Sequence, residues 1–175
     1  MIEVQNLTKS FSGFQALSGA SLTVPAGSIY GLVGPNGAGK TTLCKLLAGY
    51  EKPKEGEVLL DGRPLAHGRG YCPVQMIWQH PETVVDPLMK LGDTLAEGWP
   101  VEQRVLDGLH IEPGWLERYP TELSGGELQR FCIARALGPA TRFLLCDEIS
   151  TMLDLVTQAQ IWNFVAGGNQ EWTLE

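Results

Sequence analysis

The feature that most restricts the fold is a glycine-rich loop, Gly34-Pro35-Asn36-Gly37-Ala38-Gly39-Lys40-Thr41-Thr42. It matches the pattern G-x-x-x-x-G-K-[ST], in which small residues let successive backbone N–H groups curl around a phosphate. A helix opening at Gly39 would add its positive end to the same anion. Lys40 supplies a mobile charge for the β- and γ-phosphates, and the Thr41 hydroxyl is placed to ligate Mg²⁺. The pattern predicts a nucleotide-binding loop.

The residues around this loop have the pattern that such a loop requires. Residues 28–33 form a compact apolar run before Gly34, which predicts a buried strand. Leu43, Leu46 and Leu47 then fall on one face of a helix that closes at Gly49. A glycine-rich turn without a ligand is the alternative, and the flanking strand and helix make it improbable.

Strands and helices alternate along the rest of the chain, which predicts an α/β protein with a mostly parallel sheet. Residues 82–121 interrupt this order with helical fragments broken by prolines, and we interpret them as a small helical insertion. The expected strands are 2–4, 20–24 (after a turn at 12–13), 57–60 (before a turn at 61–62), 74–79 and 142–146, and the expected helices are 91–96, 101–109, 115–119, 124–137 and 155–166.

Two carboxylates, Asp147 and Glu148, follow the apolar run 143–146. In a fold with a phosphate loop, such a strand lies beside the one that feeds the loop, so its end arrives next to Mg²⁺. Asp147 would then orient the metal, and Glu148 would polarise the attacking water as a general base. Taken alone, the same pattern would more simply be a strand ending in a solvated turn.

Composition excludes several other classes of protein. The 175 residues carry a net charge of -7, which disfavours a nucleic-acid grip based on bulk charge. No apolar run is long enough to span a membrane, and the start lacks the layout of a signal peptide. The four cysteines form no CxxC pair, so we expect free thiols in a reducing compartment, with Cys44 and Cys146 in the core.

The segment Leu123–Arg130, which reads LSGGELQR, resembles the LSGGQ-type signature of ABC ATPases, with Glu127 in place of the more usual glutamine. Ser124 can cap a helix whose N-terminus presents amides to an anion. An ordinary helix start is the local alternative, and the order of the motifs disfavours it. The resemblance implies that Ser124, Gly125, Gly126 and Glu127 contact the γ-phosphate held by the opposite subunit. ATP would then lie between two subunits.

The same resemblance assigns roles to three further residues. Phe11 is similar to the aromatic residue that stacks on adenine, although a plain core phenylalanine is the alternative. Gln79 resembles the Q-loop glutamine that reaches the metal and the water and senses the transmembrane partner. Asp154 closes a segment, 150–154, that resembles the D-loop crossing to the other subunit.

The implied fold is a P-loop NTPase (RecA-like) core with an N-terminal antiparallel β-subdomain. Residues 1–81 and 122–175 would form one nucleotide-binding core, and 82–121 its helical subdomain. Residues 86–93, 147–154 and 157–162 are similar to the ATPases of peptide and nickel importers. Family members continue into an apolar strand ending in a switch histidine. No histidine follows His110 here, so we expect a domain that lacks this last part.

Three functions follow from the resemblance. The first is the ATPase subunit of an importer, a homo- or heterodimer that binds permease subunits on the inner face of the membrane and uses ATP and Mg²⁺. The second is a soluble ATPase acting on DNA or ribosomes, disfavoured by the acidic balance and by the short stretch between Thr41 and Ser124. The third is a nucleotide-binding and dimerisation module without turnover.

Overall fold

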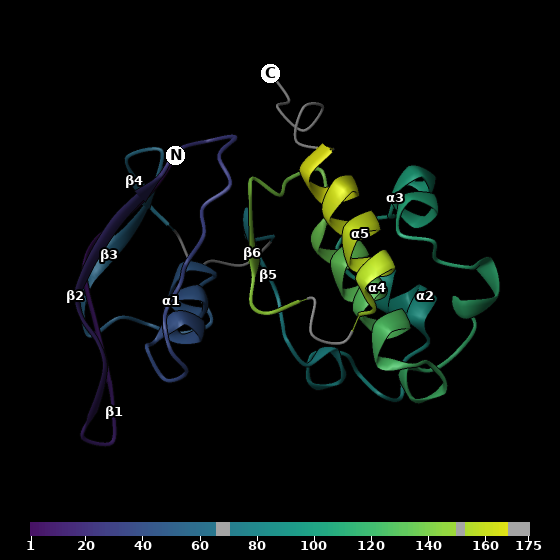
Figure 1. Ribbon diagram of the computed structural model, residues 1–175, viewed down its shortest axis with the longest axis horizontal. Helices are drawn as coiled ribbons and strands as arrows, with labels where there is room; N and C mark the ends of the chain where they lie inside the picture. The colour runs from purple at the N-terminus through teal and green to yellow at the C-terminus, as the bar shows by residue number, and fades with distance from the viewer. Residues whose placement is uncertain (66–70, 150–152, 168–175) are drawn as a thin grey trace. The chain divides into compact units, whose positions relative to one another are not determined.

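The computed structural model describes residues 1–65, 71–149 and 153–167. The chain divides into two compact units, Met1–Val74 and Gln75–Glu175 (Figure 1). Among the residues described, none of the helices combines the length and the apolar character needed to cross a membrane.

The N-terminal unit is built on a four-stranded antiparallel sheet in the order β2-β1-β3-β4. The strands are β1 (Ile2–Phe11), β2 (Phe14–Val24), β3 (Glu55–Leu60) and β4 (Arg63–Pro64). Two tight turns join neighbouring strands, at 12–13 and at 61–62, and all four turn residues have positive φ. Positive φ at both central residues is what a type I′ hairpin requires. Both predicted turns are therefore confirmed.

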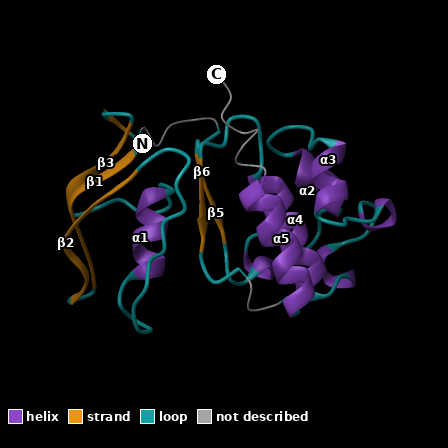
Figure 2. Ribbon diagram, turned by 45° about the horizontal axis from the view of Figure 1, so that its top comes forward, coloured by secondary structure: helices purple, strands orange, loops and turns teal. Residues whose placement is uncertain are grey.

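Helix α1 (Lys40–Leu47) lies beside this sheet in both views (Figures 1 and 2). Leu43, Leu46 and Leu47 are buried, as the helical spacing predicts. The sheet contributes buried residues of its own, among them Val4 and Leu7. The helix that follows the phosphate loop therefore packs by its apolar face, and its N-terminal end directly continues the loop.

The prediction of a buried strand over residues 28–33 is wrong. This segment forms no strand, and Ile29 and Val33 are 79% and 96% exposed. An apolar run becomes a strand only when a neighbouring strand accepts its backbone hydrogen bonds, and within the described ranges no segment pairs with this one. The four-stranded sheet is antiparallel, as the implied N-terminal antiparallel β-subdomain requires, and it is not the mostly parallel sheet that the alternation of elements predicts.

The C-terminal unit combines a two-stranded sheet with helices (Figure 2). Two strands pair with each other, β5 (Val74–Ile77) and β6 (Phe143–Cys146). Strand β5 begins at the boundary between the units. One hydrophobic cluster joins the helices, and Leu91, Phe131 and Ile133 are fully buried in it. The helices are α2 (Leu91–Ala96), α3 (Gln103–Gly108), α4 (Gly125–Ala136) and α5 (Leu155–Gly167), with 3₁₀ turns at Pro81–Thr83, Pro113–Trp115 and Pro120–Glu122.

Two local expectations for the C-terminal unit need correction. The helix predicted over 115–119 is replaced by the 3₁₀ turn Pro113–Trp115, because Pro120 forces Tyr119 into an extended conformation. The strand predicted over 74–79 ends at Ile77.

The cysteines predicted in the core, Cys44 and Cys146, are only half-buried. Cys132 is buried instead, and burial raises the pKa of its thiol to about 12.

Candidate functional site

The phosphate loop of the N-terminal unit adopts a backbone that only glycine accommodates readily. Gly37 and Gly39 have φ values of 84° and 88°, in the left-handed region. A Cβ atom at Gly39 would lie 2.6 Å from the carbonyl oxygen of Ala16, on the neighbouring strand β2. Between the glycines, the N–H of Ala38 donates to the carbonyl of Pro35 at 3.1 Å, which closes a turn around Asn36. Side chains are excluded where the backbone must bend.

Helix α1 leaves its first backbone donors available. Its first main-chain bond runs from the N–H of Leu43 to the carbonyl of Gly39 at 2.8 Å, and no side chain caps its N-terminus. The N–H groups of Lys40, Thr41 and Thr42 precede that bond and point toward the loop end of the helix. An anion bound there would meet these donors and the positive end of the helix dipole.

Lys40 is half-buried and folds back over the loop. Its Nζ atom donates to the carbonyl oxygens of Gly34 at 2.7 Å and Pro35 at 3.0 Å. These contacts hold the ammonium group at the mouth of the loop, where a phosphate oxygen could replace a carbonyl as acceptor. Thr41 is exposed, so its hydroxyl is accessible to a metal ion that arrives with a phosphate.

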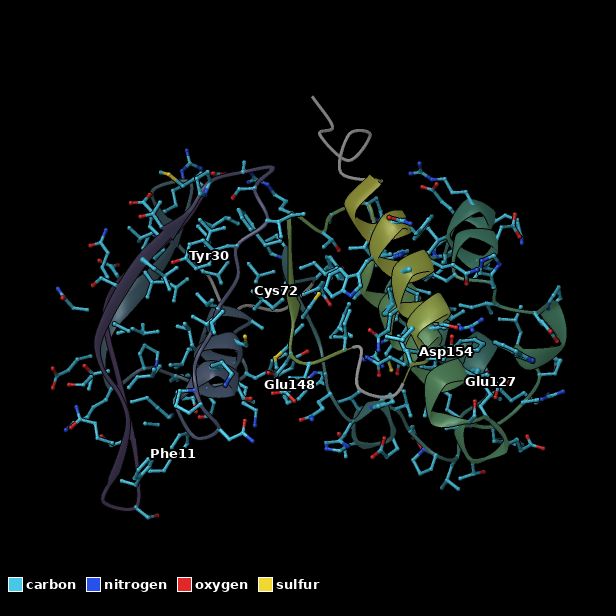
Figure 3. The ribbon with its side chains drawn as sticks, viewed as in Figure 1. Phe11, Tyr30, Cys72, Glu127, Glu148 and Asp154 are labelled. Carbon is cyan, nitrogen blue, oxygen red and sulfur yellow. The ribbon has the colours of Figure 1, made fainter. Side chains whose placement is uncertain are left out.

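Phe11 lies at the end of β1, next to the turn of the β1–β2 hairpin (Figure 3). It is 41% exposed, and the Nζ atom of Lys9 lies 4.9 Å from the centroid of its ring. The same ammonium group pairs with Glu51 at 2.7 Å, which fixes it over the ring. Phe11 is therefore not a core residue, and its stacking on adenine stays a prediction.

The C-terminal unit brings Gln79, Asp147 and Glu148 together at the ends of β5 and β6. The backbone N–H of Asp147 donates to the carbonyl of Ile77 at 3.1 Å, which places the two strand ends side by side. The Nε2 group of Gln79 donates to Oε2 of Glu148 at 3.0 Å. Asp147 is 9% exposed, whereas Glu148, labelled in Figure 3, is exposed and has a φ of 52°. A left-handed backbone is uncommon outside glycine, and it marks Glu148 as a constrained position.

The signature segment starts α4 with a reciprocal cap. The hydroxyl oxygen of Ser124 accepts from the N–H of Glu127 at 3.3 Å. In return, Oε2 of Glu127 accepts from the N–H and the hydroxyl of Ser124, each at 2.7 Å. These bonds, the hydroxyl first, lower the pKa of Glu127 because they favour its ionised form. The glycines Gly125 and Gly126 form the first turn of the helix.

Asp154 caps the next helix, α5. Its two carboxylate oxygens accept from the backbone N–H of Thr157 at 3.0 Å and from the hydroxyl of Thr157 at 2.6 Å. This is the geometry of a helix N-cap. The role predicted for Asp154 in the D-loop stays a prediction, and residues 150–152 of that segment lie outside the described residues.

Sequence reasoning missed Gln129, a fully buried glutamine on α4. Its Nε2 group donates to the carbonyl of Trp78, the residue before Gln79, at 3.1 Å. The signal that could have identified it is its position. Gln129 occupies the same helical stripe as Cys132, Ile133 and Ala136, all of which are buried, so it is the polar member of an otherwise apolar face.

The predicted metal ligands divide between the units. Thr41 belongs to the N-terminal unit, and Gln79 and Asp147 belong to the C-terminal one. In the part of the chain that the structure describes, no three His, Cys, Asp or Glu side chains form a metal cluster. Such a cluster is not what Mg²⁺ needs, because it usually takes one or two carboxylates and completes its shell with phosphates and water. Within each unit the predicted ligands offer oxygen atoms of the kind that Mg²⁺ prefers, and the shared magnesium site stays a prediction.

Comparison with protein families identifies the chain. Residues 17–151 match the family model described as ABC transporter. The methionine import ATP-binding protein MetN of Caulobacter vibrioides is 38% identical over 98% of this chain and 56% of its own length. The sulfate/thiosulfate import ATP-binding protein CysA of Rhodopseudomonas palustris is 38% identical over 91% of this chain and 50% of its length. The chain therefore spans about half the length of these curated relatives.

Solved structures show the same fold. A dimeric ATP-binding cassette in a post-hydrolysis state, bound to ADP and Pi, superposes with a TM-score of 0.84 at 24% identity, covering 98% of this chain and 84% of that chain. A dimeric bacterial ABC transporter cassette gives a TM-score of 0.82 at 25% identity, over the same shares. The fold class predicted from the sequence, a P-loop NTPase cassette of mixed α/β structure, is confirmed.

Proposed function

This chain belongs to the ABC transporter family, and from that premise we propose that it is the ATP-binding subunit of an importer. The observation that carries the proposal is the open N-terminus of α1. Uncapped N–H groups, glycines at positive φ and the ammonium group of Lys40 meet there in one loop. Each of these features suits the triphosphate of ATP, because each supplies donors or positive charge without a competing side chain.

Hydrolysis would proceed by in-line attack of water on the γ-phosphorus of ATP. The bond from water oxygen to phosphorus forms as the bond to the β–γ bridging oxygen breaks, and ADP and phosphate leave. Glu148 accepts the proton of the attacking water, and Lys40 stabilises charge on the β- and γ-phosphate oxygens. Mg²⁺, held by Thr41, Asp147 and Gln79 together with phosphate oxygens, would supply further positive charge at these oxygens.

ATP would lie between two subunits, with Ser124 to Glu127 and Asp154 of one facing the phosphate loop of the other. The dimeric form of the similar solved cassettes supports this arrangement. Residues 82–121 would act as a helical subdomain that passes the closure of the dimer to a permease. The subunit would then be cytoplasmic and peripheral on the inner face of the membrane.

The class of solute is a finer proposal. The relatives reported above are named for the import of methionine and of sulfate or thiosulfate, and a third, of Rhodococcus jostii, for Fe(3+) ions. A peptide or nickel solute rests only on the resemblance of 86–93, 147–154 and 157–162 to the importers of those solutes. Uptake of labelled solutes by cells with and without the gene would test it, because a defect limited to another solute would contradict it.

The central test measures MgATP binding and phosphate release by this chain, with Glu148→Gln as the matched variant. We expect both proteins to bind ATP and only the wild type to release phosphate above background. Equal inactivity with retained binding would replace the proposal by a nucleotide-binding and dimerisation module. Loss of binding in the wild type would contradict both. Capture of ribosomes, in place of a membrane permease, would favour the soluble alternative.

A further inference from the structure

Gln129 is a polar side chain in a setting that favours an apolar one. It is fully buried, at 0% exposure, on α4 beside Leu128 and Phe131. A leucine would satisfy the helical stripe, and it would not carry the desolvation cost of an amide. A glutamine at this position therefore needs a reason that packing does not supply.

One end of the Gln129 amide is used and the other is not. The Nε2 group donates to the carbonyl of Trp78 at 3.1 Å, across a sequence separation of 51 residues. The Oε1 atom is buried, and among the described residues it has no hydrogen-bond partner. Since an unsatisfied buried acceptor opposes folding, the bond to Trp78 is the specific interaction that this side chain makes.

The carbonyl that Gln129 holds immediately precedes Gln79. Trp78 directly follows Ile77, the last residue of β5, and therefore lies between the strand and Gln79. Two residues beyond the end of β5, the Nε2 group of Gln79 donates to Glu148 at 3.0 Å. A shift of the Trp78 carbonyl would move the attachment point of the Gln79 side chain, and with it this hydrogen bond.

We propose that Gln129 is a positioning residue that anchors Trp78 from the signature helix and thereby sets the Gln79 amide against the Glu148 carboxylate. The chain of contacts runs from α4 through the Gln129 side chain and the Trp78 backbone to Gln79, which bonds to Glu148, the proposed general base. The link to catalysis rests on the proposed function of Glu148, whereas the anchoring itself does not. Displacement of α4 would thus be transmitted to the position of the base.

The anchoring is tested by the side-chain NH₂ signals of Gln79 in an NMR spectrum of the ¹⁵N-labelled chain, identified by their loss in Gln79→Ala. In Gln129→Met, which keeps the length of the side chain but removes the donor, we expect these signals to move toward the position typical of solvated glutamine. The matched control is Thr94→Val, because Thr94 is also buried in this unit and its hydroxyl donates to the carbonyl of Lys90, the residue that precedes α2. The control should leave the Gln79 signals in place.

Unchanged Gln79 signals in Gln129→Met, or equal changes in the control, would overturn the proposal. If Gln129→Met does not fold, Gln129→Asn replaces it, since that amide is one methylene too short to reach Trp78 with the same helix position. Circular dichroism of each variant checks the fold. These readouts require no hydrolysis, so they decide the anchoring even if the wild type releases no phosphate.

Phosphate release then tests the catalytic consequence. We expect Gln129→Met to lower kcat about ten- to a hundredfold with little change in KM for ATP, because a misplaced group loses its geometry without losing nucleotide contacts. In a Gln79→Ala background the same substitution should add almost nothing. If Gln129→Met lowers kcat by the same factor in the wild type and in the Gln79→Ala background, Gln129 does not act through Gln79.

Discussion

The two helices that the motifs place at the nucleotide, α1 and α4, begin in opposite ways. Helix α1 starts at an uncapped glycine, without an acidic residue in its first turn. Helix α4 starts at Ser124 with a closed capping box, and Glu127 brings negative charge into its first turn. The first presents free donors to an anion, whereas in the second the capping box already pairs the N–H groups of Ser124 and Glu127. The two helix starts therefore differ in how many backbone donors are already paired before an anion arrives.

Because of this difference, a bound phosphate would replace different contacts at the phosphate loop and at the signature segment. The phosphate loop holds its ammonium group on two of its own carbonyls, and a phosphate would compete for it. At the signature, the hydroxyl of Ser124 donates to Glu127, so a phosphate that meets Ser124 must displace a carboxylate. We expect the first segment to dominate the affinity of the chain for ATP and the second to add stability in its absence.

The largest effect should come from Lys40→Ala. Removing the charge that faces the phosphates should weaken MgATP binding on the order of a hundredfold, as when one partner of a buried charge pair is truncated. Titration calorimetry measures the change. Lys45→Ala removes the same charge from the last turn of α1 and should leave the affinity within about twofold, because a helix end that far from the loop contributes little. Similar losses in both variants would mean that net charge, and not the loop, binds ATP.

Gly39→Ala should come next. The left-handed backbone and the contact with the Ala16 carbonyl should together cost about 2 to 3 kcal/mol of unfolding free energy. Gly13→Ala has a φ of 90° but no atom within 4 Å of its Cβ position, so it should cost only about 1 kcal/mol. Urea unfolding measures both. If the two substitutions lower the unfolding free energy equally, the loop does not approach β2 closely at Gly39.

Ser124→Ala should lower the unfolding free energy by about 1 kcal/mol, the usual value for a lost helix cap. At the same time it should leave MgATP binding to a single chain unchanged. Thermal or urea unfolding gives the first quantity and calorimetry the second. A large loss of affinity in a monomeric sample would contradict the division of roles between α1 and α4.

The smallest effect should come from Glu127→Gln. At pH 7 we expect a loss of about 0.5 kcal/mol, since a charge near a helix N-terminus contributes that much when it is solvent-screened. The pKa of Glu127 is lowered in the folded protein, so its contribution is present above the ordinary carboxyl value of 4.5 and is lost as the pH falls through the lowered value. Unfolding curves of the two proteins should therefore converge in acid. If the difference in unfolding free energy between the two proteins stayed constant down to pH 3, the charge of Glu127 would not be its cause.

Much of the local structure could be predicted from the sequence, because it depends on local chemistry. The stripe of leucines predicted α1, the glycine-rich motif predicted the phosphate loop, and Ser124 predicted a capped helix, whereas the part of Glu127 in that cap was not predicted. Each of these depends on residues within about two helical turns. The alternation of strands and helices predicted an α/β protein, and the motifs implied a P-loop NTPase, a fold class that the solved cassettes confirm.

Features that depend on distant neighbours were not predictable in the same way. Hydropathy indicated that residues 28–33 suit a strand, but it contains no information about whether another strand lies beside them. The bond between Gln129 and Trp78 joins positions far apart in the chain, and only the polar residue in an apolar stripe hinted at it.

The exposed apolar segment at residues 29–33 has a practical consequence for work with the chain. Tyr30 and Leu32 are exposed together with Ile29 and Val33, and a contiguous exposed apolar stretch favours association between molecules. We expect the chain to self-associate as its concentration rises, starting at this segment. Light scattering over a dilution series would give the concentration below which titrations report on single molecules, and a lysine at Val33 should raise it.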